Sequence, residues 1–374
     1  MPAFPVAFPR AVTQVRLWRN TRPALASALL ESLLTMVRVV RATQVEIESA
    51  VQALRDGELV AFPTETVYGL GANAQNPAAV RKIFEAKGRP PTHPVIVHLD
   101  DPRFLHRWVR EVPPAATRLA EAFWPGPLTM VMPRAAHVHE VITGGQDTIA
   151  IRVPAHPMAQ QLLTAFGGGI AAPSANRYGR LSPTRAEHVR EELGDAVRVI
   201  LDGGECQLGL ESTIVAFEGD TVRLLRPGGI TAAQVRAVAG ELLLGPGAES
   251  PRVPGGTPTH YAPTTPMTLV PAGEIDAQAD AASAGGRRVA VLAQRLPLRA
   301  HKYVTWINAG RRPESFGRDL YANLRTLDKA GCQQILVQAV PDGERWDAIR
   351  DRLLHAASNV AESDDVTGTM AVLP

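Results

Sequence analysis

The stretch that most constrains this fold is a buried strand that stops at a proline and continues into a polar loop. Residues 59–62 are the apolar run Leu-Val-Ala-Phe, which predicts a strand buried on both faces. Pro63 has no amide hydrogen to donate, so we expect the strand to end there. Hydroxyl and acidic side chains follow in residues 64–68, at the carboxyl end of the strand, where open α/β sheets bind ligands. The stretch therefore predicts an α/β domain with a binding site beside this strand.

A helix after this loop is expected to bring two cations to the same site. Asn76 and Pro77 suit the N-cap and the first position of a helix, and Gly88 suits its C-terminal end. Lys87 and Arg89 then leave the last turn side by side. Two cations near a loop of hydroxyl groups suit a polyanionic ligand that carries polar substituents.

Two further strands carry a polar residue near their ends. In residues 148–153 the apolar side chains alternate, which places Thr148 and Arg152 together on the other face. An inward-facing arginine is costly unless it is paired. Arg152 therefore either binds a carboxylate or phosphate, or makes a salt bridge to an acid of the sheet itself. The strand in residues 94–99 carries His98, which is either a packed core residue or a ligand contact.

Short segments later in the chain add hydroxyl groups and another cation. Residues 170–172 are expected to form a strand, and Ser174 follows them without the G-x-S-x-G pattern of a hydrolase nucleophile. We expect residues 182–187 to form a capping box whose free amides could hold an anion. Ser212 precedes a strand, and Arg226 ends what we expect to be the last strand of the domain.

Seven blocks of the sequence resemble blocks of the threonylcarbamoyl-AMP synthase family, which has the YrdC-like fold. They are residues 62–71, 87–90, 124–127, 128–132, 172–176, 209–215 and 260–263, of which 124–127 and 128–132 are expected to be structural. The resemblance implies the long, two-domain form of that family. Its fold would be α/β (α+β), with a twisted, open YrdC-like sheet and its helices linked to a second, small Rossmann-like α/β domain.

The resemblance also implies a nucleotidyltransferase reaction. L-Threonine, bicarbonate and ATP would give L-threonylcarbamoyl-AMP and pyrophosphate. This is the first step of threonylcarbamoyl modification of the adenosine beside the anticodon in some tRNAs. ATP is thus expected as a substrate, with Mg²⁺ bridging its phosphates and no metal ligand identified in the protein. A downstream tRNA threonylcarbamoyl transferase complex is the expected partner.

The resemblance carries the family's site residues to matching positions of this sequence. Lys87 and Arg89 are expected to be catalytic. His93 stands where the family usually has asparagine, although imidazole can still donate a hydrogen bond. The expected ATP contacts are Lys87, Arg89, His93, Thr148, Ser174, Ser182, Arg226 and Tyr261. The expected L-threonine contacts are Thr66, His98, Arg152, Ala172 and Ser212.

Composition narrows the remaining classes of function. A formal net charge of +2 over 374 residues gives no overall field that favours nucleic acid or membrane, so direct tRNA binding is expected to be weak. The two cysteines, Cys206 and Cys332, cannot build a zinc finger, and they fit a reducing, cytoplasmic compartment. No apolar run approaches the ~20 residues of a membrane span. An RNA-binding module and a carbamoyltransferase that use the same cleft are the alternatives to a synthase.

Composition along the chain indicates four segments. Residues 1–36 hold four arginines and a single acid, which resembles a transit peptide or an over-extended start with Met36 as the initiator. Residues 37–244 are the expected catalytic domain. Residues 245–266 are a Pro/Gly-rich linker that either covers the active site or serves as a passive tether. Residues 267–374 alternate strands and helices, which is typical of a small parallel α/β domain, and the sequence does not indicate its role.

Overall fold

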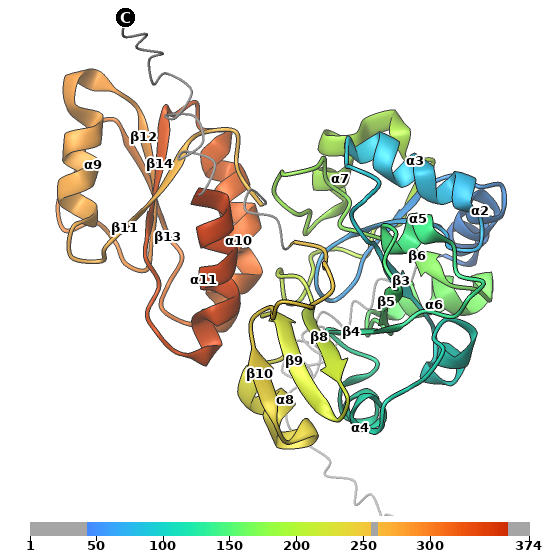
Figure 1. The fold of residues 1–374 in the computed structure, drawn as a ribbon. Helices are drawn as coiled ribbons and strands as arrows, with labels where there is room; N and C mark the ends of the chain where they lie inside the picture. Colours follow the sequence, from blue (N-terminus) through green and yellow to red (C-terminus); the bar gives the residue numbers. More distant parts are fainter. Residues whose placement is uncertain (1–42, 256–260, 358–374) are drawn as a thin grey trace, which may run out of the picture. The chain divides into compact units, whose positions relative to one another are not determined.

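The computed structural model describes residues 43–255 and 261–357, so the expected N-terminal extension, residues 1–36, lies outside the described residues. Two β-sheets organise the described chain, one of ten strands and one of four. Helices flank both sheets (Figure 1). Within residues 43–255 and 261–357, no helix combines the length and the apolar character that crossing a membrane requires.

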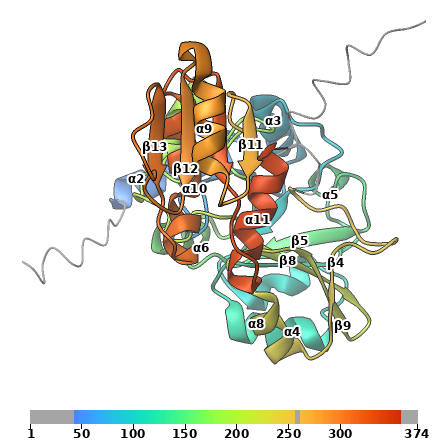
Figure 2. The same cartoon turned by 90° about the vertical axis from the view of Figure 1, so that its left-hand side faces the viewer.

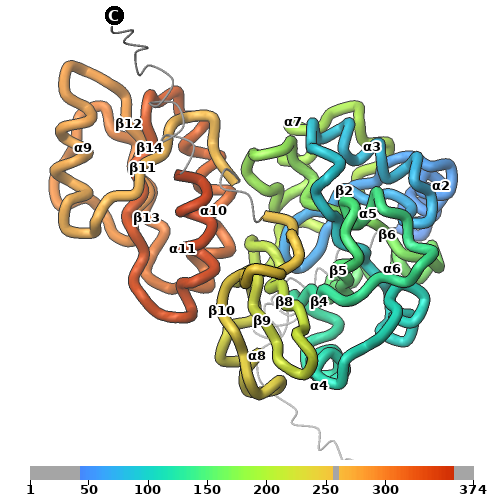
Figure 3. The backbone as a smooth tube through the Cα atoms, viewed as in Figure 1, coloured from blue at the N-terminus to red at the C-terminus, as the bar shows by residue number. Residues whose placement is uncertain are grey.

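The larger sheet mixes parallel and antiparallel pairs. Its strand order is β10-β9-β8-β4-β5-β3-β6-β2-β1-β7, with β8, β9 and β10 as neighbours at one edge (Figure 3). The strands are β1 (Val60–Phe62), β2 (Gly69–Asn73), β3 (Ile96–His98), β4 (Leu128–Pro133), β5 (Thr148–Arg152), β6 (Ile170–Ala171), β7 (Val199–Ile200), β8 (Thr213–Glu218), β9 (Thr221–Arg226) and β10 (Leu242–Leu244). The expected α/β (α+β) class with an open sheet is confirmed.

The helices of the first domain begin and end largely where the sequence indicates. They are α2 (Gln44–Arg55), α3 (Pro77–Lys87), α4 (Pro114–Phe123), α5 (Glu140–Thr143), α6 (Pro157–Phe166), α7 (Ala186–Leu193) and α8 (Ala232–Ala239), with 3-10 turns at Pro102–Arg107 and Gly194–Ala196. The side chain of Asn76 caps α3, and Gly88 ends it in the left-handed region with φ 61°. Lys87 and Arg89 therefore leave the helix together, as expected.

Three local features differ from the sequence-based expectations. Residues 182–187 do not form a capping box, because α7 begins at Ala186 and its N-cap, Arg185, makes no side-chain cap bond. Arg226 does not end the last strand of the domain, since β10 follows and pairs in parallel with β9. Strand β2 was not expected. A Cβ at Gly71 would lie 2.8 Å from the Ile170 side chain, so glycine is what lets β2 and β6 pair closely.

The second domain is built on a parallel sheet, as expected. Its strand order is β11 (Met267–Val270), β14 (Gln334–Gln338), β12 (Val289–Ala293) and β13 (Val304–Asn308). One face of this sheet is covered by α9 (Ile275–Ser283), which a 3-10 turn at Ala284–Gly286 follows. The other face is covered by α10 (Pro313–Asp328) and α11 (Glu344–Ala357). Figures 1 and 2 show this three-layer arrangement.

The two domains share an apolar cluster. Leu181 and Leu210 of the first domain belong to the same buried cluster as Phe316 and Tyr321 of α10. Tyr261 of the linker also lies in this cluster. Contact between the domains therefore includes buried apolar side chains as well as polar groups.

Candidate active site

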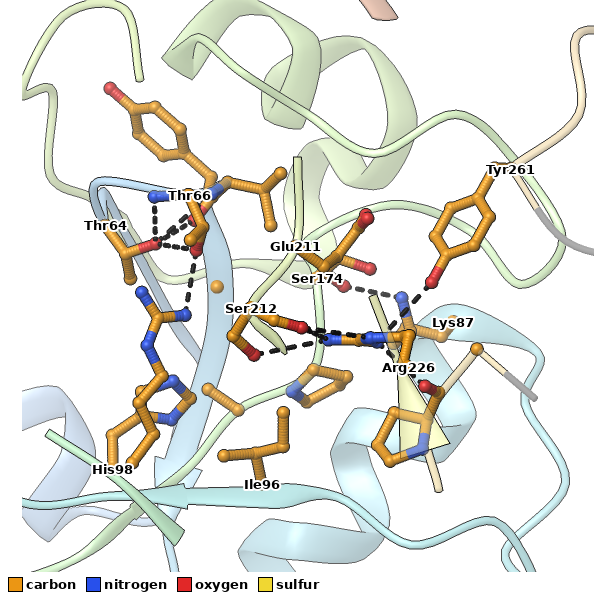
Figure 4. A pocket seen from close by; sticks show the side chains of 18 of the residues that line it. Thr64, Thr66, Lys87, Ile96, His98, Ser174, Glu211, Ser212, Arg226 and Tyr261 are labelled. Carbon is orange, nitrogen blue, oxygen red and sulfur yellow. Dashed lines mark hydrogen bonds between the residues drawn. The ribbon is translucent and has the colours of Figure 1, made fainter. Parts of the chain in front are cut away.

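A cleft in the first domain brings together ten of the residues that the family motifs indicate. Its lining comes from the loop after β1, the end of α3, strands β3 and β5, and the segments around β6, β8 and β9 (Figure 4). The indicated residues that line it are Thr66, Lys87, Arg89, His98, Arg152, Ala172, Ser174, Ser212, Arg226 and Tyr261.

The cleft lies over a face of the sheet and not only at the carboxyl ends of strands. Ile96 and His98 point to the same side of β3, and both line the cleft. His98 is in register with Arg152 of β5, while Ala172, after β6, donates its amide to the carbonyl of Ile96. The sheet contains both parallel and antiparallel strands. Polar residues from strands of opposite direction therefore lie at both ends of this face.

Arg152 is held by protein groups at one end of the cleft. Its Nη1 donates to Thr66 Oγ1 at 2.8 Å, and its Nε donates to the carbonyl of Gly126 at 3.2 Å. Its Nη2 forms a buried ion pair with Glu65 Oε1 at 2.6 Å. The salt bridge to an acid of the domain is thus present, and the guanidinium also faces the cleft. The salt-bridge reading of Arg152 from the sequence is therefore confirmed, and its binding of a ligand carboxylate or phosphate stays a prediction.

His98 is a neutral imidazole beside Arg152. Burial, followed by the positive charge of Arg152, lowers the pKa of His98 to about 3. Its ring stands edge-on to Phe62 at 5.9 Å between centroids. Its Nδ1 is buried without a hydrogen-bond partner in the described part of the chain. At neutral pH the uncharged ring could therefore form a hydrogen bond with a ligand in the cleft.

Lys87 and Arg89 form a second, cationic part of the cleft. The Lys87 ammonium donates to the carbonyl of Ser174 at 2.6 Å and to that of Asn176. Burial, and next the charge of Arg89, hold the pKa of Lys87 well below its usual value. Arg89 donates to the carbonyl of Pro94 at 2.8 Å, and burial lowers its pKa to about 10, which leaves it charged at neutral pH. A bound polyanion would favour the protonated form of Lys87.

Arg226 bonds to Ser212 and to the linker. Its Nη2 donates to the carbonyl of Ser212 at 2.9 Å and approaches the Ser212 hydroxyl at 3.2 Å. Its Nη1 donates to the carbonyl of Pro254 at 2.8 Å and lies 3.5 Å from the Tyr261 hydroxyl. The cleft therefore has four buried cationic side chains that come from different elements: Lys87, Arg89, Arg152 and Arg226.

Three of the indicated residues do not line this cleft. His93 lines a neighbouring pocket that also contains Arg89 and Gly255, and burial, then the charge of Arg89, lowers the pKa of His93. Thr148 lies at the opposite end of β5 from Arg152, although alternation puts both on the same face. The hydroxyl of Ser182 donates to Glu211 at 2.5 Å, so a bond to the protein already uses its hydrogen.

Glu211 is a cleft residue that the sequence analysis did not single out. It lies next to Ser212, is 6% exposed and lines the cleft. Burial acts to raise its pKa, but the charges of Arg352 and Arg226 and hydrogen bonds outweigh burial and hold the pKa at about 2. An ionised carboxylate between two cationic residues has no local sequence signature, because Arg352 is 141 positions away.

Described residues of the linker line the cleft. Pro254, Gly255 and Tyr261 line it, and Val253 packs with Ile96, Ala150 and Ile214 on the apolar part of the sheet face. Tyr261 is 1% exposed and has a left-handed φ of 60°, which is unusual for a residue with a side chain. The space left in the cleft is about 50 Å³, enough for only a few water molecules.

Two family models match the chain. The first, described as "Telomere recombination", matches residues 52–228. The second, described as "Threonylcarbamoyl-AMP synthase, C-terminal domain", matches residues 230–358. The first segment contains nine strands of the larger sheet, and the second contains its edge strand β10 and all four strands of the smaller sheet.

The similar proteins named next match this chain over nearly all of their own length. A threonylcarbamoyl-AMP synthase of Bacillus subtilis (strain 168) is 42% identical over 323 residues, which are 83% of this chain and 93% of that protein. One of Pyrococcus abyssi is 38% identical over 323 residues, 83% of this chain and 94% of that protein. A solved structure of P. abyssi Sua5 complexed with L-threonine superposes with a TM-score of 0.79 at 38% identity, covering 85% of this chain and 95% of that one.

Proposed function

Because this chain belongs to the family of two-domain threonylcarbamoyl-AMP synthases, we propose that its cleft joins L-threonine, bicarbonate and ATP into L-threonylcarbamoyl-AMP and pyrophosphate. It is an enzyme of the nucleotidyltransferase class, with L-threonine and ATP as substrates. The observation that carries the proposal is the set of four buried cations that line one cleft beside hydroxyl groups.

This chemistry needs positioning more than a strong nucleophile. The neutral amine of threonine adds to carbon dioxide formed from bicarbonate and loses a proton, which gives a carbamate. A carbamate oxygen then attacks the α-phosphorus of ATP, the bond from that phosphorus to the bridging oxygen breaks, and pyrophosphate leaves. Both reactants are anions, so fixed cations are needed to hold them in line and to stabilise the leaving group. One well-placed donor contributes roughly 3 kcal/mol to such a transition state.

Threonine would occupy the Arg152 end of the cleft. The guanidinium faces its carboxylate, and Thr66, which already bonds to Arg152, contributes a second polar contact. The neutral ring of His98 and the hydroxyl of Ser212 would meet the threonine side chain or amine. Ala172 offers a backbone group at the boundary with the nucleotide.

ATP would occupy the Lys87 end and extend beneath the linker. Lys87, Arg89 and Arg226 would hold the phosphates, with Ser174 beside them. The base would take the place of Val253 on the apolar face formed by Ile96, Ala150 and Ile214, which leads along β5 toward Thr148. His93 and Tyr261 would then contact the nucleotide from its two sides, and Ser182 would act through Glu211.

Mg²⁺ would bind to the phosphates of ATP and not to ligands from the protein. Within residues 43–255 and 261–357, no three His, Cys, Asp or Glu side chains come together as a ligand set. Glu211 lines the cleft, but Ser182, Tyr321 and Arg352 engage its two oxygens. The residues present therefore do not fit a Mg²⁺ site built by the protein, and no step is assigned to the ion.

The product would pass to a tRNA threonylcarbamoyl transferase complex in the cytoplasm. Direct binding of tRNA by this cleft is not favoured, because Lys87, Arg89, Arg152 and Arg226 are all less than 10% exposed. Phosphate contacts to a nucleic-acid backbone require cations that reach the surface. The burial of these four residues therefore argues against the RNA-binding alternative.

The test is a reconstitution with the purified full-length chain. L-Threonine, bicarbonate and ATP with Mg²⁺ are supplied together and then omitted one at a time, and threonylcarbamoyl adenylate is detected by mass spectrometry. We expect product only when all three substrates are present, with one pyrophosphate released per adenylate. Pyrophosphate release that does not need threonine would contradict the proposal, and turnover of added carbamoyl phosphate would instead favour a carbamoyltransferase.

A further inference from the structure

Two residues of the second domain reach the Glu211 carboxylate in the wall of the cleft. Arg352 of α11 donates from Nε to Glu211 Oε2 at 2.8 Å, and the hydroxyl of Tyr321 of α10 lies 3.0 Å from the same oxygen. Ser182 donates to the other oxygen, Oε1. The Glu211 side chain is thus fixed in direction by groups from both domains, and it is the residue immediately before Ser212.

Arg352 holds a second segment of the cleft at the same time. Its Nη1 donates to the carbonyl of Pro227 at 3.0 Å, and Pro227 immediately follows Arg226. Asp351 accepts from the same nitrogen at 2.6 Å. The guanidinium is 1% exposed, so these bonds are made without competition from water.

The same guanidinium also lies against the linker. Its carbon is 5.2 Å from the centre of the Tyr261 ring, within the range of a cation–π contact. The ring of Tyr321 also stacks on Tyr261, with 5.9 Å between centroids. Tyr261 therefore rests on α10 and α11 of the second domain, while its hydroxyl points toward Arg226.

The backbone around Glu211 has little freedom to accommodate a different arrangement. A Cβ on Gly209 would come within 2.1 Å of the carbonyl oxygen of Arg318 in α10. A Cβ on Gly228 would come within 2.3 Å of the Thr213 amide. The segments 209–213 and 226–228 are therefore packed against each other and against α10, and Arg352 spans both.

We propose that Arg352 is a positioning residue for the synthase reaction, through which the second domain holds the threonine side and the ATP side of the cleft in register. The proposal rests on the proposed function, since it assigns Ser212 to threonine and Arg226 to ATP. Arg352 touches neither substrate. Arg352 fixes the position of Glu211, and with it the adjacent Ser212, relative to Pro227 and Arg226. It also supports the ring of Tyr261, which lies beside these segments.

This role predicts an effect on turnover that exceeds the effect on binding. When two bound reactants lose alignment, the rate of the chemical step falls, while each reactant keeps most of its own contacts. For Arg352→Gln we expect kcat to fall on the order of 10- to 100-fold. The KM values for ATP and for L-threonine should each change by less than about threefold. Arg352→Lys keeps the charge beside Glu211 but cannot bond to Glu211 and Pro227 as a planar fork, so its kcat should be intermediate.

The experiment uses the full-length chain and compares these variants with two others. Tyr321→Phe keeps the stacked ring and removes only the hydroxyl that meets Glu211, so it should fold and lose kcat by roughly three- to tenfold. Arg345→Gln is the matched control, because Arg345 lies on the same helix as Arg352, is 69% exposed and pairs with Glu314 at the surface. Its kcat should equal that of the wild type. Kinetics are measured well below the melting temperature of each variant.

Amide hydrogen exchange without substrates gives a second measurement that does not depend on activity. Faster exchange in residues 209–213 and 226–228 of Arg352→Gln, relative to Arg345→Gln, is the expected result. Unchanged exchange in these segments would overturn the proposal, as would wild-type kcat in folded Arg352→Lys and Tyr321→Phe. A wild-type chain that makes no adenylate would instead refute the proposed function, and the exchange measurement would still decide whether Arg352 orders the two segments.

Discussion

Glu65 and Arg152 form a buried ion pair, with Oε1 and Nη2 only 2.6 Å apart and both side chains less than 10% exposed. The arginine expected to receive the threonine carboxylate is therefore already balanced by an acid of the protein. In the interior such a pair is retained only when further bonds satisfy both partners, and here Thr66, Gly126 and Ala155 supply them. A threonine carboxylate would have to share the guanidinium with Glu65.

This sharing leads to a first prediction, for Glu65→Gln. Removal of the charge leaves Arg152 without its buried counter-ion, which should destabilise the chain by about 3–5 kcal/mol. Saturating L-threonine supplies a carboxylate to the same guanidinium. The increase in melting temperature that L-threonine causes should therefore be larger for Glu65→Gln than for the wild type. Differential scanning fluorimetry measures both shifts. Glu58→Gln, at the surface pair with Lys82, is the control, and an equal threonine shift in all three proteins would place the carboxylate elsewhere.

A second prediction concerns the two lysines of α3. Lys87 is 4% exposed and lines the cleft, whereas Lys82, five residues earlier, is 41% exposed and pairs with Glu58. Lys87→Ala removes a cation from the proposed phosphate site, so kcat for adenylate formation should fall by about 100-fold or more. Lys82→Ala should leave kcat unchanged. Threonine- and bicarbonate-dependent pyrophosphate release measures the effect, and a Lys87→Ala enzyme with near-wild-type turnover would remove Lys87 from the site.

A third prediction tests the linker with two glycines that have similar backbone conformations. Gly245 and Gly255 both have positive φ, 74° and 83°, so alanine at either position costs about 1–2 kcal/mol of backbone strain. A Cβ at Gly255 would also come within 2.2 Å of the Tyr261 hydroxyl, whereas a Cβ at Gly245 meets nothing within 4 Å. Gly255→Ala should therefore displace Tyr261 from Arg226 and lower turnover about tenfold relative to Gly245→Ala. Equal turnover of the two variants would favour a passive tether.

A fourth prediction concerns pH and His98. The pKa of His98 is about 3 in the folded chain and 6.5 as its ordinary value, so between these values the unfolded chain binds more protons. The stability that neutral His98 confers is complete above pH 6.5 and is lost as the pH falls toward 3. His98 alone contributes a slope of up to about 1.4 kcal/mol per pH unit. Urea denaturation between pH 7 and pH 4.5 should show a shallower loss of stability for His98→Gln than for the wild type.

The control for this measurement is His106→Gln, because His106 lies at the surface. Its stability should follow the wild-type dependence on pH. A His98→Gln variant with the same slope as the wild type would mean that His98 titrates near its ordinary value in the folded chain.

Local sequence signals predicted most of the elements and most of the cleft. Asn76 and Gly88 mark the ends of a helix through bonds or backbone angles that lie within a few residues, and both act as expected. The expected alternation of strands and helices in the second domain is present over the described residues 267–357. Ten of the thirteen site residues indicated by the family motifs line one cleft, since a polar residue next to a buried strand is already constrained in position.

The features that the sequence missed depend on segments far apart in the chain. Strand β2 exists because Gly71 lets β6, about 100 residues later, come close. The expected capping box in residues 182–187 is absent because α7 begins only at Ala186, and Ser182 in that segment bonds to Glu211. Helix α9 was also missed, because its alanine-rich sequence has only a weak amphipathic pattern. In each case a tertiary partner, or the lack of a strong local preference, decided the outcome.

The sequence by itself determined which residues could do the chemistry, because helix caps, strand ends and family motifs are local patterns of residue type. Only the tertiary structure decided which charges are paired. Glu65 meets Arg152, and Glu211 meets Arg352, across 87 and 141 positions of the chain. The reason is physical: the energy of a buried charge depends on its distance from an opposite charge and on the exclusion of water, and folding alone sets both.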